Sequence, residues 1–302
     1  MANEVQYHLA QQANANGLQI TYDSFGDLAD PVIILIMGLG TQMIHWNDEF
    51  CELLARNNLR VLRFDNRDIG KSTWLTSSPV PSVLNFIGNS LFSKKVNAPY
   101  LLDDMADDTL ALMDALNIGR AHLVGASMGG MIAQCIALKS PERVSSLTSI
   151  MSTTGNRSLP KAKARIGVKL LKPLAKEIDL YVAQSLEIWK MLHGEHFPFD
   201  KDRVEKVIRD SRHRGFNPAG VARQLSAIID SPDRTNGLQQ LQIPSLVIHG
   251  DSDPLVPVAC GIATAQAIPN ATLKILKGMG HTLPVQLWPQ IVDEISTLTK
   301  AG

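Results

Sequence analysis

The segment Gly125-Ala126-Ser127-Met128-Gly129 places a serine between two glycines at an abrupt change of local pattern. An apolar run typical of a strand precedes it, and the run 130–138, typical of a helix, follows it. A tight turn between a strand and a helix strains the backbone of the serine and requires small neighbours where the two elements approach. Because such a turn lifts the hydroxyl of Ser127 off the end of the strand, the segment predicts a serine nucleophile rather than a linking loop.

A serine nucleophile needs a base and an acid, and the acid is expected after the apolar run 245–250, which predicts a buried strand. Asp251 and Asp253 both follow this run. Pro254 favours an extended conformation at Asp253, which suits a carboxylate presented at a strand tip. We favour Asp253 because such loops usually present the later of two acids. Asp251 is the alternative acid. If it does not have this role, we expect it to be a turn residue whose side chain hydrogen-bonds to the nearby backbone.

The base is expected after the next strand, which the run 272–276 predicts. His281 follows this run and stands next to flexible glycines, so its ring can reach between Ser127 and Asp253. The chain order serine, aspartate, histidine is typical of one fold in particular. The sequence therefore predicts a catalytic triad of Ser127, Asp253 and His281.

An oxyanion hole requires two backbone donors near the serine. Met128 stands at the start of the predicted helix and supplies the first N–H group. The continuous apolar run 31–37 predicts a strand buried on both faces of a parallel sheet, and it ends in Gly38-Leu39-Gly40. We predict that Leu39 supplies the second N–H group, with Gly40 as the alternative.

Taken together, these segments resemble the α/β-hydrolase superfamily and, within it, the aclacinomycin methylesterase-like carboxylesterases. The resemblance covers roughly residues 30–150 and 235–300. It implies an α/β-hydrolase fold, with a mostly parallel central sheet flanked by helices, and hydrolysis of carboxylic esters through an acyl-enzyme, without metal or cofactor. The residues that carry it are Met37–Gly40, Trp46–Phe50, Arg63–Asp68, the serine turn, His249–Pro257 and Gly278–His281.

Two positions depart from the wider superfamily. Met37 stands where many members have histidine, and Asp68 replaces a glycine in the loop that usually reads D-x-R-G-x-G-x-S. Neither position belongs to the predicted triad. Both departures leave the substrate class open.

The order of predicted elements indicates one catalytic domain with an insertion. Residues 1–30 predict antiparallel edge strands, and strands then alternate with helices, including helices expected at 50–57 and 105–116. From 152 to 238 the strand pattern gives way to helical segments with charged faces. We therefore expect a hydrolase core of residues 1–151 and 239–302 and a helical cap, or lid, of residues 152–238.

Composition limits the partners of the 302-residue chain. It has 29 basic and 29 acidic side chains, which gives no reason to expect nucleic-acid binding. Three cysteines without paired spacing suggest buried thiols, and a single surface disulfide is the alternative. The first residues lack the basic region and the apolar region of a signal peptide, so none is expected. No apolar run is long enough to span a bilayer. The sequence predicts a cytoplasmic protein without a metal site, and it leaves the oligomeric state open.

The predicted substrate is a small-molecule ester with an apolar acyl group. The same triad also serves C–C bond hydrolases and thioesterases, and some hydrolase folds act as ligand receptors with slow turnover. The basic and apolar stretch 161–176 is expected to be a solvated lid helix, with docking to a lipid surface as the alternative.

Overall fold

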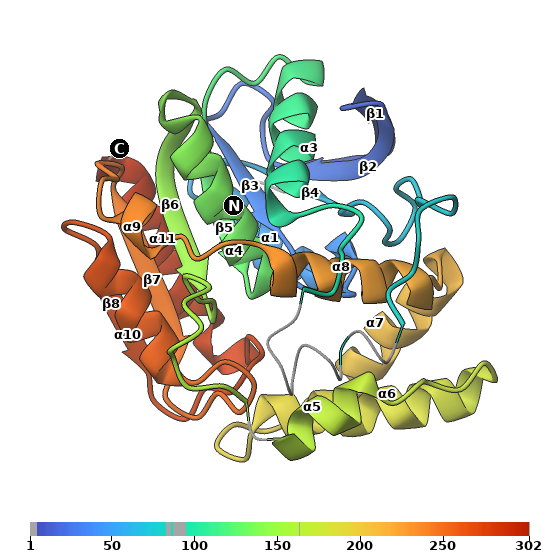
Figure 1. The fold of residues 1–302 in the computed structure, drawn as a ribbon. Coiled ribbons are helices and arrows are strands. Elements are labelled where there is room, and N and C mark those ends of the chain that lie inside the picture. Colours follow the sequence, from blue (N-terminus) through green and yellow to red (C-terminus); the bar gives the residue numbers. More distant parts are fainter. Residues whose placement is uncertain (1–4, 83–85, 87–94, 163, 302) are drawn as a thin grey trace.

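The computed structural model describes residues 5–82, 86, 95–162 and 164–301. Its centre is an eight-stranded sheet in the order β1-β2-β4-β3-β5-β6-β7-β8, with helices on both faces (Figure 1). The first two neighbour pairs are antiparallel and the other five are parallel. The strands are β1 (Tyr7–Ala15), β2 (Leu18–Phe25), β3 (Val32–Ile36), β4 (Arg60–Phe64), β5 (Ala121–Ala126), β6 (Val144–Ile150), β7 (Ser245–Gly250) and β8 (Thr272–Leu276).

The central strands are buried on both faces because their sequences are continuously apolar. In β3, Ile34 and Ile36 pack into one hydrophobic cluster, whereas Ile33 and Leu35 pack into the cluster on the other face. This alternation follows the two-residue period of a strand. An apolar run without polar interruptions is therefore what a two-sided parallel sheet requires.

Different helices cover the two faces. Side chains of α3, α4 and α8 belong to the first cluster, and those of α1 and α11 belong to the second. The helices are α1 (Asp48–Ala55), α3 (Leu102–Ala115), α4 (Met128–Lys139), α5 (Ala164–Leu171), α6 (Ile178–His193), α7 (Lys201–Arg214), α8 (Pro218–Asp230), α9 (Thr235–Leu238), α10 (Val258–Ala267) and α11 (Trp288–Ala301), with 3₁₀ turns at Met43–His45, Pro141–Arg143 and Val285–Leu287.

The predicted fold class is confirmed, including the antiparallel strands at the start of the chain. Helix boundaries differ by one to three residues from those expected. The helix expected at 105–116 begins at Leu102, because the Asp104 carboxylate accepts the N–H of Leu101 at 2.7 Å and so caps the first turn. All three cysteines are free and buried, as expected of thiols packed in the core.

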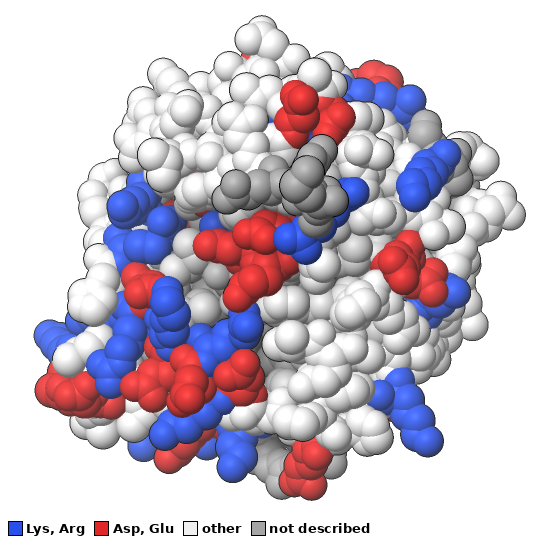
Figure 2. Space-filling view, turned by 180° about the vertical axis from the view of Figure 1, so that it is seen from behind, with Lys and Arg blue, Asp and Glu red and all other residues white. Residues whose placement is uncertain are grey.

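Between β6 and β7 the chain forms α5 to α9, and its described residues include no strand. In Figure 1 helices α5 to α8 gather at one end of the molecule, and α8 lies closest to the sheet. None of the described helices combines the length and apolar character needed to cross a membrane. On the face shown in Figure 2, acidic and basic side chains are interspersed, in line with the balanced charge of the chain.

Candidate active site

The serine turn has the strained geometry that its sequence predicts. Ser127 has φ 55° and ψ −119°, an uncommon conformation for a residue other than glycine. A Cβ atom on Gly125 would lie 2.2 Å from the carbonyl oxygen of Gly129, and one on Gly129 would lie 2.0 Å from that of Ile36. Both positions therefore require glycine, because strand β5, strand β3 and helix α4 come too close for any side chain.

His281 lies between the serine and an aspartate. Its Nδ1 atom is 2.6 Å from Asp253 Oδ2, and its Nε2 atom is 3.0 Å from Ser127 Oγ. An ionised carboxylate only accepts hydrogen bonds, so Nδ1 carries the proton and Nε2 is free to accept from the serine hydroxyl. The three side chains follow β5, β7 and β8, whose carboxyl ends lie at the same edge of the sheet.

The two candidate acids occupy different positions. Asp253 Oδ1 accepts the backbone N–H groups of Leu255 and Val256, both at 2.8 Å, which orients Oδ2 toward His281. Asp251 instead accepts the backbone N–H of Gly278 at 2.7 Å and ties the turn after β7 to the loop after β8. The geometry therefore gives Asp253 the position beside the imidazole and Asp251 a role within the loop.

The loop after β3 lies against the serine because β3 and β5 are neighbours in the sheet. A Cβ atom on Gly38 would be 3.7 Å from Ser127 Oγ. The Gly40 N–H group donates to the side chain of Gln224 at 2.9 Å, whereas the N–H of Leu39 has no hydrogen-bond partner among the described residues. Met128 is the first residue of α4, so its N–H has no partner within the helix.

A second imidazole, that of His249, lies behind Asp253, and no motif predicts this position apart from the four-residue spacing of the two residues. His249 is fully buried, and its Nε2 atom is 2.8 Å from the carbonyl of Val256 and 3.7 Å from Asp253 Oδ2. Its Nδ1 atom has no partner among the described residues. Burial lowers the pKa of His249 and outweighs the opposite effects of Val256 and Asp253.

Stability should therefore depend on pH through His249. Below a pH of about 6.5 this histidine takes up a proton in the unfolded chain but resists protonation in the folded one, so the free energy of unfolding falls as the pH falls. His249→Gln should reduce this slope by up to about 1.4 kcal/mol per pH unit. Urea denaturation of both proteins between about pH 7 and pH 5 measures it, and identical slopes would contradict the assignment.

Two ion pairs join helices α7 and α8 to the loop after β4. Arg214 of α7 contacts Asp65 at 2.5 Å, and Arg223 of α8 contacts Asp68 at 2.6 Å. The side chains of Asp65, Asp68 and Arg223 are at most 2% exposed. The unusual aspartate at position 68 is thus explained by a buried arginine that a glycine could not neutralise.

Helix α6 contacts the loop that carries the histidine. The backbone N–H of His281 donates to the carbonyl of Leu192 at 2.7 Å, and a Cβ atom on Gly280 would lie 2.3 Å from that same oxygen. The position of the imidazole therefore depends on the end of α6 as well as on β8.

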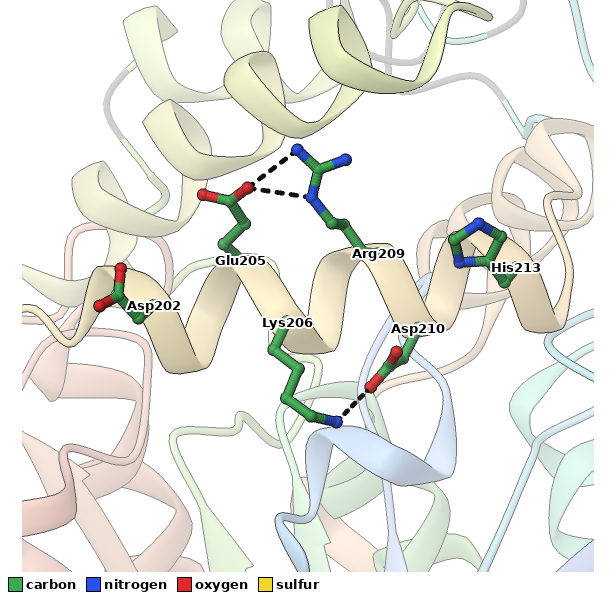
Figure 3. A pocket seen from close by; sticks show the side chains of 6 residues that line it. All are labelled: Asp202, Glu205, Lys206, Arg209, Asp210 and His213. Carbon is green, nitrogen blue, oxygen red and sulfur yellow. Dashed lines mark hydrogen bonds and ion pairs between the residues drawn. The ribbon is translucent and has the colours of Figure 1, made fainter.

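The exposed face of α7 lines a hollow, which Figure 3 shows. Glu205 pairs with Arg209, and Lys206 pairs with Asp210. Exposed pairs one helical turn apart are common on solvated helices and contribute little to stability. These two pairs account for four of the six lining residues, and Asp202 and His213 are the other two.

No group of three His, Cys, Asp or Glu side chains among the residues described has the arrangement needed to hold a metal ion.

Comparison with known proteins identifies the family. A family model described as "alpha/beta hydrolase fold" matches residues 31–286, so the chain belongs to this family. Rhodomycin D methylesterase DauP of Streptomyces sp. (strain C5) is 28% identical, over 93% of this chain and 94% of that protein. A 2-hydroxy-6-oxononadienedioate/2-hydroxy-6-oxononatrienedioate hydrolase of Paraburkholderia phymatum is 32% identical, over 87% and 85% of the two chains.

Solved structures agree on the fold. The crystal structure of an enol-lactonase from Burkholderia xenovorans LB400 superposes with a TM-score of 0.73, covering 96% of this chain and all of that one at 22% identity. At this identity the likeness concerns the fold alone.

Proposed function

We propose that this protein is a serine hydrolase that cleaves carboxylic esters through an acyl-enzyme intermediate. The observation that carries the proposal is the hydrogen-bonded series Ser127, His281, Asp253, with distances of 3.0 and 2.6 Å. Family membership and similarity to a methylesterase support hydrolase chemistry.

In the proposed mechanism His281 Nε2 takes the hydroxyl proton as Ser127 Oγ attacks the ester carbonyl. Asp253 stabilises the imidazolium that forms, and the N–H groups of Leu39 and Met128 hold the oxyanion. His281 then gives its proton to the departing alkoxide. Water, activated by the same imidazole, attacks the acyl-enzyme and releases the acid.

The charges at the loop after β4, near the proposed site, favour a neutral ester over an anionic substrate. Arg67 lies in the loop after β4, and Arg214 and Arg223 contact this loop. Each of these three arginines is paired with an aspartate. Their positive charge is therefore already neutralised within the protein. This supports an uncharged, apolar acyl group as the ligand of the site.

We also propose that residues 152–238 form a cap over a core of residues 1–151 and 239–302. Helices α6, α7 and α8 contact the loops after β8, β4 and β3, all at the edge of the sheet that carries the serine. A cap in this position would limit access of water to the acyl-enzyme.

The test is hydrolysis of p-nitrophenyl esters with acyl chains from two to twelve carbons in length, compared between wild type and Ser127→Ala. Saturable turnover that depends on Ser127 would support the proposal, and the chain-length profile would define the acyl pocket. No turnover across the series would contradict a general esterase.

The second candidate is hydrolysis of a C–C bond in an oxo-dicarboxylate. It rests on the 32% identity to the 2-hydroxy-6-oxononadienedioate/2-hydroxy-6-oxononatrienedioate hydrolase. Turnover of such a dianion in preference to p-nitrophenyl esters would select this function. Because Arg67, Arg214 and Arg223 are already paired with aspartates, the charges near the site favour a neutral ester over such a dianion.

A further inference from the structure

The oxyanion loop is connected to helix α8 by one buried side chain. Gln224 is fully buried, and its Oε1 atom accepts the N–H of Gly40 at 2.9 Å. Its Nε2 atom donates to the carbonyl of Arg67 at 2.9 Å. A single amide group thus connects α8 to the loop after β3 and to the loop after β4.

Helix α8 is itself fixed relative to these loops. Arg223, the residue before Gln224, donates to both carboxylate oxygens of Asp68 at 2.8 and 2.6 Å. Val221 lies one turn away and would be 3.2 Å from a Cβ atom on Gly40, which has φ +68°. The loop after β3 is therefore packed against α8 as well as hydrogen-bonded to it.

We propose that Gln224 is a positioning residue for the oxyanion loop, an inference that rests on the proposed esterase function. By accepting the Gly40 N–H it removes one of the two candidate donors from the site. It also fixes the orientation of the preceding peptide, which leaves the Leu39 N–H as the group facing the oxyanion. A cap helix thereby positions the loop that binds the oxyanion, although Gln224 itself touches no reacting atom.

The cost of losing this contact should appear in the chemical step rather than in substrate binding. An oxyanion donor contributes little to the ground state, and removing one typically lowers kcat by about 100- to 1000-fold. Misplacing a donor is a smaller change. We therefore expect Gln224→Met to lower kcat by about 10- to 100-fold while KM changes by less than about threefold.

The experiment compares Gln224→Met with Gln224→Glu and with Gln42→Met. Gln224→Glu keeps an acceptor for the Gly40 N–H but loses the donor to Arg67, so its kcat should lie between those of wild type and Gln224→Met. Gln42 is the matched control, since this buried glutamine also joins the core to the cap. Its amide donates to the carbonyls of Ser211 and Gly215 and accepts from Arg214 Nε at 2.8 Å, without touching Gly40. Gln42→Met should keep kcat within about threefold of wild type, because its side chain makes no hydrogen bond to residues 38–40 and the Gly40 N–H keeps its bond to Gln224.

A second readout is the rate at which an alkyl fluorophosphonate reacts with each variant, followed by mass spectrometry of the peptide that contains Ser127. The phosphoryl oxygen of this probe occupies the oxyanion position, so its reaction should slow in parallel with kcat for Gln224→Met. Wild-type kcat in Gln224→Met, or an equal loss in Gln42→Met, would overturn the inference while leaving the esterase proposal standing. A wild-type protein that is not labelled at Ser127 would overturn both.

Discussion

Ser127→Ala should abolish ester hydrolysis while leaving the fold intact. Removing the nucleophile of a Ser-His-Asp triad typically lowers kcat by about 10⁴- to 10⁶-fold. The side chain is partly exposed and alanine is smaller, so no buried contact is lost. Steady-state kinetics on the most reactive p-nitrophenyl ester, with circular dichroism of both proteins, measures the effect.

The matched control is Ser152→Ala, the next serine along the chain that contacts the turn. Ser152 Oγ donates to the carbonyl oxygen of Ser127 at 2.7 Å, so it supports the turn without lying in the triad. Its loss should cost far less activity than the loss of Ser127. If Ser127→Ala retained most of the wild-type kcat, the mechanism would be wrong.

Asp68→Ala should lower the free energy of unfolding by about 3–5 kcal/mol, because it leaves the guanidinium of Arg223 buried without a partner. Burial alone would raise the pKa of Asp68, but hydrogen bonds from Arg223, Leu75 and Tyr100 outweigh it and hold this pKa below its usual value. The carboxylate is therefore ionised at neutral pH and the pair carries two charges. Urea denaturation followed by tryptophan fluorescence measures the loss.

The double variant Asp68→Ala with Arg223→Met should recover much of this stability, since no buried charge remains. The exposed pair of Arg143 and Asp114 provides the contrast, because Asp114 is 65% exposed. Asp114→Ala should cost less than about 1 kcal/mol. Equal losses for Asp68→Ala and Asp114→Ala would contradict the role given to the buried pair.

The serine turn could be predicted from sequence because its cause is local. Gly125, Ser127 and Gly129 lie within five residues, and the close approach of strand and helix restricts each position to its residue type. The order of Asp253 and His281 could be predicted because parallel strands bring their carboxyl ends to one edge. The preference for Asp253 over Asp251 rested on the usual position of the acid in such loops and on the proline that follows Asp253. The structure gives the two acids different positions.

The contacts of the proposed cap could not be predicted in the same way. Gly40 and Gln224 are 184 residues apart in sequence, and Asp68 and Arg223 are 155 residues apart. No periodicity or motif links such positions in a single chain. Asp68 was visible only as a departure from a family pattern, and its reason became clear once the position of Arg223 was known. The second imidazole, His249, lacked a signal because a histidine within an apolar strand is more often a core residue.

The most direct test of the central claim is to trap the acyl-enzyme. Wild-type protein is mixed with p-nitrophenyl acetate, quenched with acid within milliseconds, digested and analysed by mass spectrometry. If the reaction passes through an acyl-enzyme, the peptide that contains Ser127 should carry one acetyl group, which forms together with a burst of p-nitrophenol. Ser127→Ala should show neither the acetyl group nor the burst. Full turnover without acetylated Ser127 at any quench time, and without a burst, would contradict the account.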